Sequence, residues 1–153
     1  MKKINEHIVD WDSVAKGFGL SLKDTIEAFN DGRMLGRIGE YVHKRSENGI
    51  RQNENSSFDV KESDGTKSEI RSITDSVSFA SSKEVGFGRN VTEEGFNKKL
   101  NSLDRYVLID KRQIVDGKLS FIEVTKEDII SLNLGKKKSM SANKFFKIYD
   151  RTQ

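Results

Sequence analysis

The sequence predicts an α/β (α+β) fold with a central mixed β-sheet flanked by helices. One observation is a set of short segments with the alternation or apolar run of strands, at 58–61, 67–74, 106–110 and 119–124. Another is that helical apolar spacing occurs before, between and after these segments. The 153-residue chain has no proline and no low-complexity linker, so we expect one domain spanning 1–153. Strands and helices that alternate along one domain favour a mixed sheet covered by helices.

The composition excludes several classes of protein. Cysteine is absent, which excludes a disulfide scaffold and a thiolate zinc site. No apolar run approaches the roughly 20 residues that span a bilayer, and the N-terminus lacks the apolar region of a signal peptide. We therefore expect a soluble cytoplasmic protein with no membrane partner. The net charge is only +3, from 27 basic and 24 acidic residues, so the distribution of charge matters more than its total.

The first part of the chain, residues 1–47, is expected to be helical. Ser21 is a typical N-cap residue before an amphipathic segment at 22–29, and a second amphipathic segment occupies 33–45. Residues 46–57 are polar and have no apolar period, so they predict a connecting loop.

A charged hairpin is predicted at 58–74. The Asp-Gly dipeptide at 64–65 favours a tight turn, because glycine adopts the positive φ that such turns require. Alternation on the second strand places Glu69 and Arg71 on one face. If the two strands pair, Asp59 lies beside Glu69, and two carboxylates next to a cation suit a hard divalent ion such as Mg²⁺. The alternative is that the hairpin is only a solvated charged surface.

Asp59 followed by Ser68-Glu69-Ile70-Arg71 resembles the metal-binding signature of the PD-(D/E)xK nucleases. The hairpin is most similar to that of the small type II restriction endonucleases of the Pvu II kind, in which a Ser-Ile pair also follows, here at 72–73. The resemblance extends over about residues 35–130. It implies a restriction-endonuclease-like fold and a Mg²⁺-dependent endodeoxyribonuclease that cuts double-stranded DNA at a short specific sequence.

The resemblance also implies roles for individual residues. Asp59, Glu69 and the main-chain carbonyl of Ile70 would hold Mg²⁺. Nucleases of this kind often direct one acidic residue of a preceding helix toward the metal, and Glu40 stands at the matching place. A surface glutamate on an amphipathic helix is the alternative for Glu40.

Arg71 departs from the family pattern, which usually has lysine at this position. Arginine stays protonated at physiological pH, so Arg71 is expected to act electrostatically by holding the scissile phosphate. Lys61, on the same strand face as Asp59, is a candidate for a displaced catalytic lysine.

Two polar segments are candidates for contact with DNA. The segment after the hairpin enters the major groove in the enzymes that the chain resembles, and arginine, lysine and asparagine are suited to reading base edges. A lysine run near the C-terminus could hold phosphates. The alternatives are a flexible Gly/Ser loop and a solvated loop. The residues expected to contact DNA are Ser81, Ser82, Lys83, Arg89, Asn90, Lys136, Lys137 and Lys138.

The domain divides into three expected parts. Residues 1–47 would supply a dimer interface, because symmetric cutting of a duplex needs two active sites and therefore a homodimer. Residues 58–133 form the catalytic core, in which Thr92 and Thr125 are expected to cap helices. Residues 134–153 form a basic C-terminal segment whose aromatic side chains anchor it to the core.

Other functions stay open at this point. A non-catalytic DNA-binding or protein-interaction module would carry the same acidic hairpin as an ordinary surface. A structure-selective nuclease such as a junction resolvase would share the metal site without reading bases. The isolated His7 and His43 lack the spacing of a histidine-based nuclease or zinc site, and no Gly-x-Ser-x-Gly elbow of a serine hydrolase is present.

Overall fold

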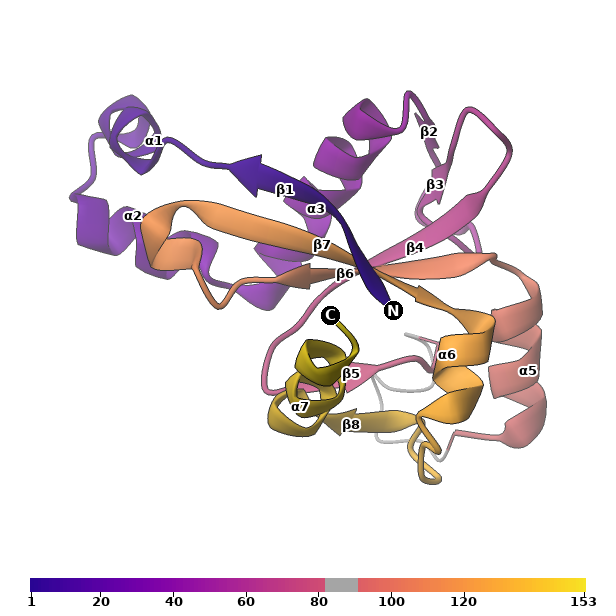
Figure 1. The fold of residues 1–153 in the computed structure, drawn as a ribbon. Coiled ribbons are helices and arrows are strands. Elements are labelled where there is room, and N and C mark those ends of the chain that lie inside the picture. Colours follow the sequence, from indigo (N-terminus) through magenta and orange to yellow (C-terminus); the bar gives the residue numbers. More distant parts are fainter. Residues whose placement is uncertain (82–90) are drawn as a thin grey trace.

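The computed structural model describes residues 1–81 and 91–153, and Figure 1 traces them. A six-stranded mixed sheet has the strand order β1-β7-β6-β4-β3-β2. Its strands are β1 (Lys2–Ile8), β2 (Ile50–Arg51), β3 (Val60–Lys61), β4 (Lys67–Ser72), β6 (Arg105–Asp110) and β7 (Lys118–Thr125). The predicted combination of a mixed sheet with helices is thus confirmed.

Helices and a small second sheet surround these strands. The helices are α1 (Trp11–Phe18), α2 (Leu22–Phe29), α3 (Gly32–Ser46), α5 (Glu93–Asn101), α6 (Lys126–Ser131) and α7 (Ala142–Thr152), with a 3-10 turn η1 (Ile114–Asp116). The second sheet pairs β5 (Ser76–Ser78) with β8 (Ser139–Ser141). In the described residues, no helix combines the length and apolar character needed to cross a membrane.

Among the described strands of the large sheet, β4 and β6 are the only parallel neighbours, and the other pairs are antiparallel. The predicted hairpin forms between β3 and β4, with Val60 opposite Ser68 and with Gly65 of the turn at φ 91°. The parallel pair needs a long connection, and the chain supplies it through β5 and α5.

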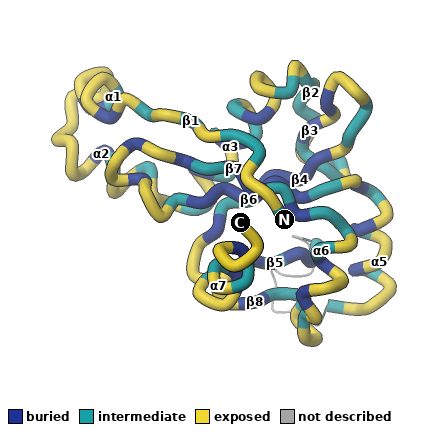
Figure 2. The backbone as a smooth tube through the Cα atoms, in the orientation of Figure 1, coloured by how far each residue is buried: buried dark blue, intermediate teal, exposed yellow. Residues whose placement is uncertain are grey.

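The sheet separates two hydrophobic clusters. On one face, α1, α2 and α3 cover Val107 and Ile109 of β6, and on the other, α5, α6 and α7 cover Tyr106 and Leu108. Adjacent residues of β6 alternate between the clusters, so this strand is buried on both faces. Figure 2 shows how the buried positions gather along the sheet.

The expected helix caps are present. The side-chain oxygens of Ser21 and Thr92 each accept a hydrogen bond from a main-chain N–H in the first turn of α2 and α5. Thr125 forms a reciprocal capping box with Asp128 at α6. The positions of short polar side chains therefore predicted three helix starts correctly.

Two expectations about the first part of the chain are wrong. Residues 1–47 are not all helical, because 2–8 form β1, which pairs along β7 from Lys2 opposite Glu123 to Ile8 opposite Lys118. The polar segment 46–57 is not only a loop, because β2 extends the sheet beyond β3. Both strands lie at edges and are only partly buried, so neither carries a strong apolar period.

Candidate active site

Asp59 lies at the edge of β4 where the pairing with β3 stops. Its main-chain N–H donates to the carbonyl of Ser68 at 3.0 Å, and its carboxylate Oδ2 accepts from the N–H of Ile70 at 2.7 Å. The N–H and C=O of a strand residue point the same way, so the Ile70 carbonyl faces the side on which Asp59 lies. The predicted meeting of Asp59 with the second strand is confirmed.

Glu69 is buried between two cations. Its Oε1 lies 3.1 Å from Nη2 of Arg71, and its Oε2 lies 2.8 Å from Nζ of Lys99. Lys99 comes from α5 and also donates to the carbonyl of Ser57 at 2.6 Å. The site is therefore assembled from the hairpin and from a helix that follows it in the chain.

Arg71 is held in place by three groups. Besides Glu69, its Nη1 donates to the carbonyl of Ser78 at 2.6 Å, and its guanidinium carbon lies 5.4 Å from the ring centroid of Tyr106. The hydroxyl of Tyr106 in turn donates to the carbonyl of Phe79 at 2.6 Å, and burial raises the pKa of this tyrosine. Arg71 is consequently a fixed positive charge, which suits recognition of an anion.

Glu40 reaches the same edge from α3, on the other side of the sheet. The helix packs closely here, since a Cβ added at Gly39 would lie 2.1 Å from Cδ1 of Ile109. Glu40 Oε2 lies 2.5 Å from Nε of Arg51 on β2, and 3.6 Å from Nη1 of Arg37. The helix can approach the strands this closely because Gly39 has no side chain.

Glu40, Asp59 and Glu69 form one electrostatic unit, here called the acidic cluster. Burial raises the pKa of Asp59 to about 6, and the charge of Glu69 adds to the rise, while the Ile70 N–H opposes it. Burial also raises the pKa of Glu40 to about 7, with further contributions from Asp59 and Glu69. Repulsion among close carboxylates is relieved by a proton or by a cation.

The acidic cluster fits a divalent cation in its chemistry. No group of three or more histidine, cysteine, aspartate or glutamate side chains has metal-binding geometry in the described residues. Mg²⁺ commonly takes only one or two carboxylates and keeps several waters, so Asp59 and Glu69 with the Ile70 carbonyl are oxygens of the kind that could hold it. Because both oxygens of Glu69 are paired with cations, a metal ion would have to share one of them with Arg71 or Lys99.

Lys99 is the site residue that sequence reasoning missed. Lys98 and Lys99 stand out in the sequence only as a basic pair. Helical spacing could have indicated that Lys99 reaches inward, because it follows Phe96 by one turn and precedes Leu100, and both of these residues are buried. A lysine at the border of a buried helical face can direct its amine inward.

Lys61 is not part of the site in this structure. It is exposed and lies opposite Lys67 at the turn end of the hairpin. The lysine that contacts Glu69 comes from α5 instead, because strand alternation alone does not show which of several nearby lysines reaches a carboxylate.

The expected DNA-contacting residues are placed only in part. Ser82, Lys83, Arg89 and Asn90 lie outside the described residues, and Ser81 directly precedes the gap. Lys136 and Lys137 are exposed in a turn before β8. Lys138 is engaged by the protein itself, with Nζ 2.5 Å from Glu93 Oε1 and 5.0 Å from the ring centroid of Phe96.

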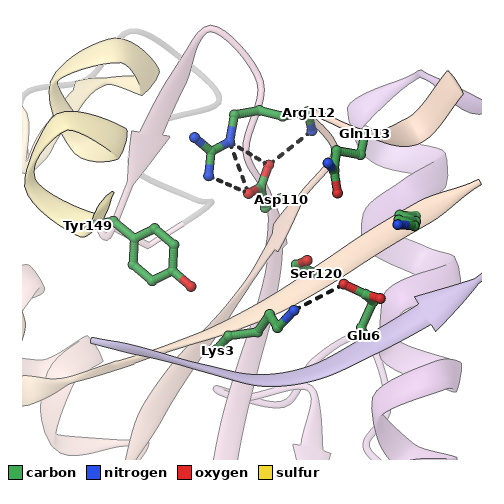
Figure 3. A pocket seen from close by; sticks show the side chains of 8 residues that line it. Lys3, Glu6, Asp110, Arg112, Gln113, Ser120 and Tyr149 are labelled. Carbon is green, nitrogen blue, oxygen red and sulfur yellow. Dashed lines mark hydrogen bonds and ion pairs between the residues drawn. The ribbon is translucent and has the colours of Figure 1, made fainter. Parts of the chain in front are cut away.

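A second polar site, here called the α7 pocket, lies between β1, the end of β6 and α7 (Figure 3). This cavity has a volume of about 400 Å³, and the acidic side chains that line it form ion pairs with cations. Glu6 lies 3.0 Å from Lys3, and Asp110 lies 2.8 Å from Arg112. The acidic cluster differs in Asp59, which makes no ion pair in the described residues and whose pKa is raised.

The chain thus brings Glu40, Asp59, Glu69 and Arg71 together, as the sequence predicted, and adds Lys99. No protein-family model, no curated protein and no solved structure matches this chain.

Proposed function

We propose that this chain is a Mg²⁺-dependent endodeoxyribonuclease that hydrolyses phosphodiester bonds of double-stranded DNA, with a restriction-endonuclease-like fold. The observation that carries the proposal is the meeting of Asp59 and Glu69 at one edge of β4, beside Arg71 and Lys99. Buried carboxylates next to fixed cations serve a reaction in which a metal ion and a phosphate must share one site. Cleavage at a specific sequence by a homodimer is the finer form of the proposal.

Each side chain has a distinct role in this chemistry. Asp59 and Glu69 would hold Mg²⁺, and a bound Mg²⁺ would lower the pKa of a water ligand and neutralise charge on the phosphate. Arg71 binds a phosphate oxygen and stabilises the charge that develops there, since its guanidinium does not give up a proton. Hydrogen bonds to Glu69 and to the Ser78 carbonyl hold the guanidinium ready for this role.

Lys99 supplies what Arg71 lacks, an amine that can exchange a proton. It lies 2.8 Å from Glu69 and is largely buried, so its ammonium is positioned beside the carboxylate rather than free in solvent. We assign Lys99 the role that the family pattern gives to the lysine two residues after the glutamate. Glu40 is the third carboxylate, close enough for its pKa to respond to Asp59 and Glu69.

A DNA-binding module without catalysis is the second candidate. The observation in its favour is that both oxygens of Glu69 are already paired, as in a purely structural ion cluster. In that case the carboxylates only repel DNA phosphates, and removing one would leave binding intact or strengthen it.

The test is cleavage of supercoiled, linear and branched DNA by wild type and Asp59→Asn, with Mg²⁺ and with chelator. Asp75→Asn is the matched control, because Asp75 is exposed and lies outside the acidic cluster. We expect discrete fragments that require Mg²⁺ and Asp59 but not Asp75. Cleavage of branched DNA alone would favour the structure-selective nuclease. DNA binding by both variants without any cleavage would replace the enzyme with the binding module.

A further inference from the structure

A buried polar network lies behind the acidic cluster. His43 of α3 is fully buried, and its Nε2 lies 2.8 Å from Oε1 of Glu62, just after β3. The same oxygen accepts from the hydroxyl of Ser68 and from Nη2 of Arg105, the latter at 2.6 Å. Arg105 also pairs with Glu123 of β7. Helix α3 is thereby joined to the hairpin and to the centre of the sheet.

The tautomer of His43 follows from its surroundings. Nδ1 is buried and has no hydrogen-bond partner in the part of the chain that the structure describes. A buried N–H without an acceptor is costly, so the ring proton belongs on Nε2, which donates to Glu62. Glu62 is ionised: burial would raise its pKa, but hydrogen bonds from Arg105, Ser68 and His43 lower it. The hydrogen bond from His43 is therefore directed at a charged acceptor, which makes it strong.

The network contacts each segment that carries the acidic cluster. His43 follows Glu40 by one turn of α3, and Glu62 stands at the opposite end of β3 from Asp59. Ser68 directly precedes Glu69 on β4, and its carbonyl accepts from the N–H of Asp59. A shift of α3 along the sheet would move Glu40 relative to the other two acids, and the hydrogen bond between His43 and Glu62 resists that shift.

We propose that His43 is a positioning residue, whose hydrogen bond to Glu62 fixes α3 against the hairpin and so places Glu40 beside Asp59 and Glu69. The inference rests on the proposed function, because it assigns the network to the same metal-dependent site. Stability alone explains the network poorly. Buried ionic groups can often be replaced by apolar side chains without loss, and an apolar residue would leave no unpaired Nδ1.

The matched pair of variants is His43→Gln and His43→Asn. Glutamine can place an amide N–H near the position of Nε2, whereas the shorter asparagine places its amide near Nδ1 and does not reach Glu62. His43→Leu removes the donor while keeping an apolar side chain, and His7→Gln on β1, at the far edge of the sheet, is the control. The whole chain is used, below the unfolding temperature of each variant.

Two measurements follow, the cleavage kinetics of duplex DNA in Mg²⁺ and the affinity for Mn²⁺ by paramagnetic resonance. We expect His43→Asn and His43→Leu to lower kcat about 10- to 100-fold with KM for DNA unchanged, and to weaken Mn²⁺ binding. His43→Gln should stay within about threefold of wild type, because the donor to Glu62 is restored. If His43 only stabilised the fold, its variants would unfold at a lower temperature. Their folded forms would then cleave DNA with the same kinetics as wild type.

The possible failures can be told apart. If wild type cleaves and folded His43→Asn cleaves equally well, the positioning role is wrong and the proposed function stands. If wild type binds Mn²⁺ without cleaving, the Mn²⁺ affinities of the Gln and Asn variants still decide the positioning role. If wild type neither cleaves nor binds Mn²⁺, the proposed function and this inference both fall.

Discussion

The acidic cluster and the α7 pocket both hold acidic side chains at the sheet, yet they differ in how their charge is balanced. In the α7 pocket, the carboxylate of Asp110 accepts several hydrogen bonds from Arg112, and these bonds raise the pKa of the arginine. In the acidic cluster, burial and mutual repulsion raise the pKa of Asp59 to about 6 and that of Glu40 to about 7. Asp110 is thus paired with Arg112, whereas Asp59 makes no ion pair in the described residues, so we expect an added cation to stabilise its charged form.

This difference shows that acidic side chains beside a cavity need not carry unbalanced charge. A buried acid that is fully paired contributes to stability or is neutral, and breaking such a pair is costly. Buried acids that repel each other destabilise the protein alone and become favourable only with a bound cation or proton. Substitution of an acidic residue should therefore have opposite effects on stability in the acidic cluster and in the α7 pocket.

The largest expected difference is in cleavage. Glu69→Gln removes a charge that we propose binds the metal, and it should lower kcat at least about 10³-fold, or about 4 kcal/mol in activation free energy. Asp110→Asn should leave cleavage within about twofold, because Asp110 lies in the α7 pocket, but it should lower the free energy of unfolding by about 1–3 kcal/mol through loss of the Arg112 pair. Cleavage rates and urea unfolding check both expectations. Equal cleavage by wild type and Glu69→Gln would contradict the assignment of the acidic cluster.

The next largest effect on cleavage is expected from substitution of the cations around Glu69. Lys99→Ala should lower kcat about 100-fold, because Lys99 is the largely buried amine beside Glu69. Lys98→Ala is the neighbouring control, since Lys98 is exposed and its loss should change binding of DNA only slightly. Lys99→Arg keeps the charge but not a group that gives up a proton at physiological pH, so it should not restore kcat. Similar kinetics for Lys99→Ala and Lys98→Ala would exclude a role for Lys99.

Much of the fold and part of the site could be predicted from the sequence. Local signals were sufficient where they were strong, as at the Asp-Gly turn, the Thr125 cap and the apolar strand at 106–110. The meeting of Asp59 with Glu69 followed from strand alternation and hairpin register, which are set by nearby residues. Predictions of this kind need no knowledge of distant contacts.

The rest depended on contacts between distant parts of the chain. Strand β1 forms because β7 offers a free edge, which residues 2–8 do not reveal. Lys99 reaches Glu69 because the connection between β4 and β6 places α5 beside the hairpin. Arg51 pairs with Glu40 because β2 joins the sheet edge. Each of these features depends on pairing between distant parts of the chain. A single sequence does not determine which distant parts pair.

Stability as a function of pH tests the unbalanced charge directly. Asp59 and Glu40 have raised pKa values in the folded state, so folding favours their protonated forms. The penalty grows as pH rises above their ordinary pKa values near 4, and it levels off above about 6 for Asp59 and about 7 for Glu40. We expect the free energy of unfolding without metal to fall by about 2 kcal/mol between pH 5 and 8, after allowing for partial solvent exposure. Asp59→Asn should flatten this dependence, whereas Asp110→Asn should not. A wild-type profile that is flat or rises across this range would contradict the repulsion inferred for the acidic cluster.

The smallest expected effect is stabilisation of the folded protein by Mg²⁺. It also distinguishes the acidic cluster from the α7 pocket most clearly. At pH 8 the acids of the cluster are ionised, so a bound cation removes their repulsion and should raise the free energy of unfolding by about 1.4 kcal/mol at 10 mM Mg²⁺, for a dissociation constant on the order of 1 mM. At pH 5 protons compete for the same oxygens, and the effect should nearly vanish. Asp59→Asn should remove the stabilisation at pH 8, while Asp110→Asn should retain it, because its paired pocket offers no free charge to a metal. Equal stabilisation of both variants would mean that Mg²⁺ acts through general ionic strength, since a site-bound ion must distinguish the unbalanced acids from the paired ones.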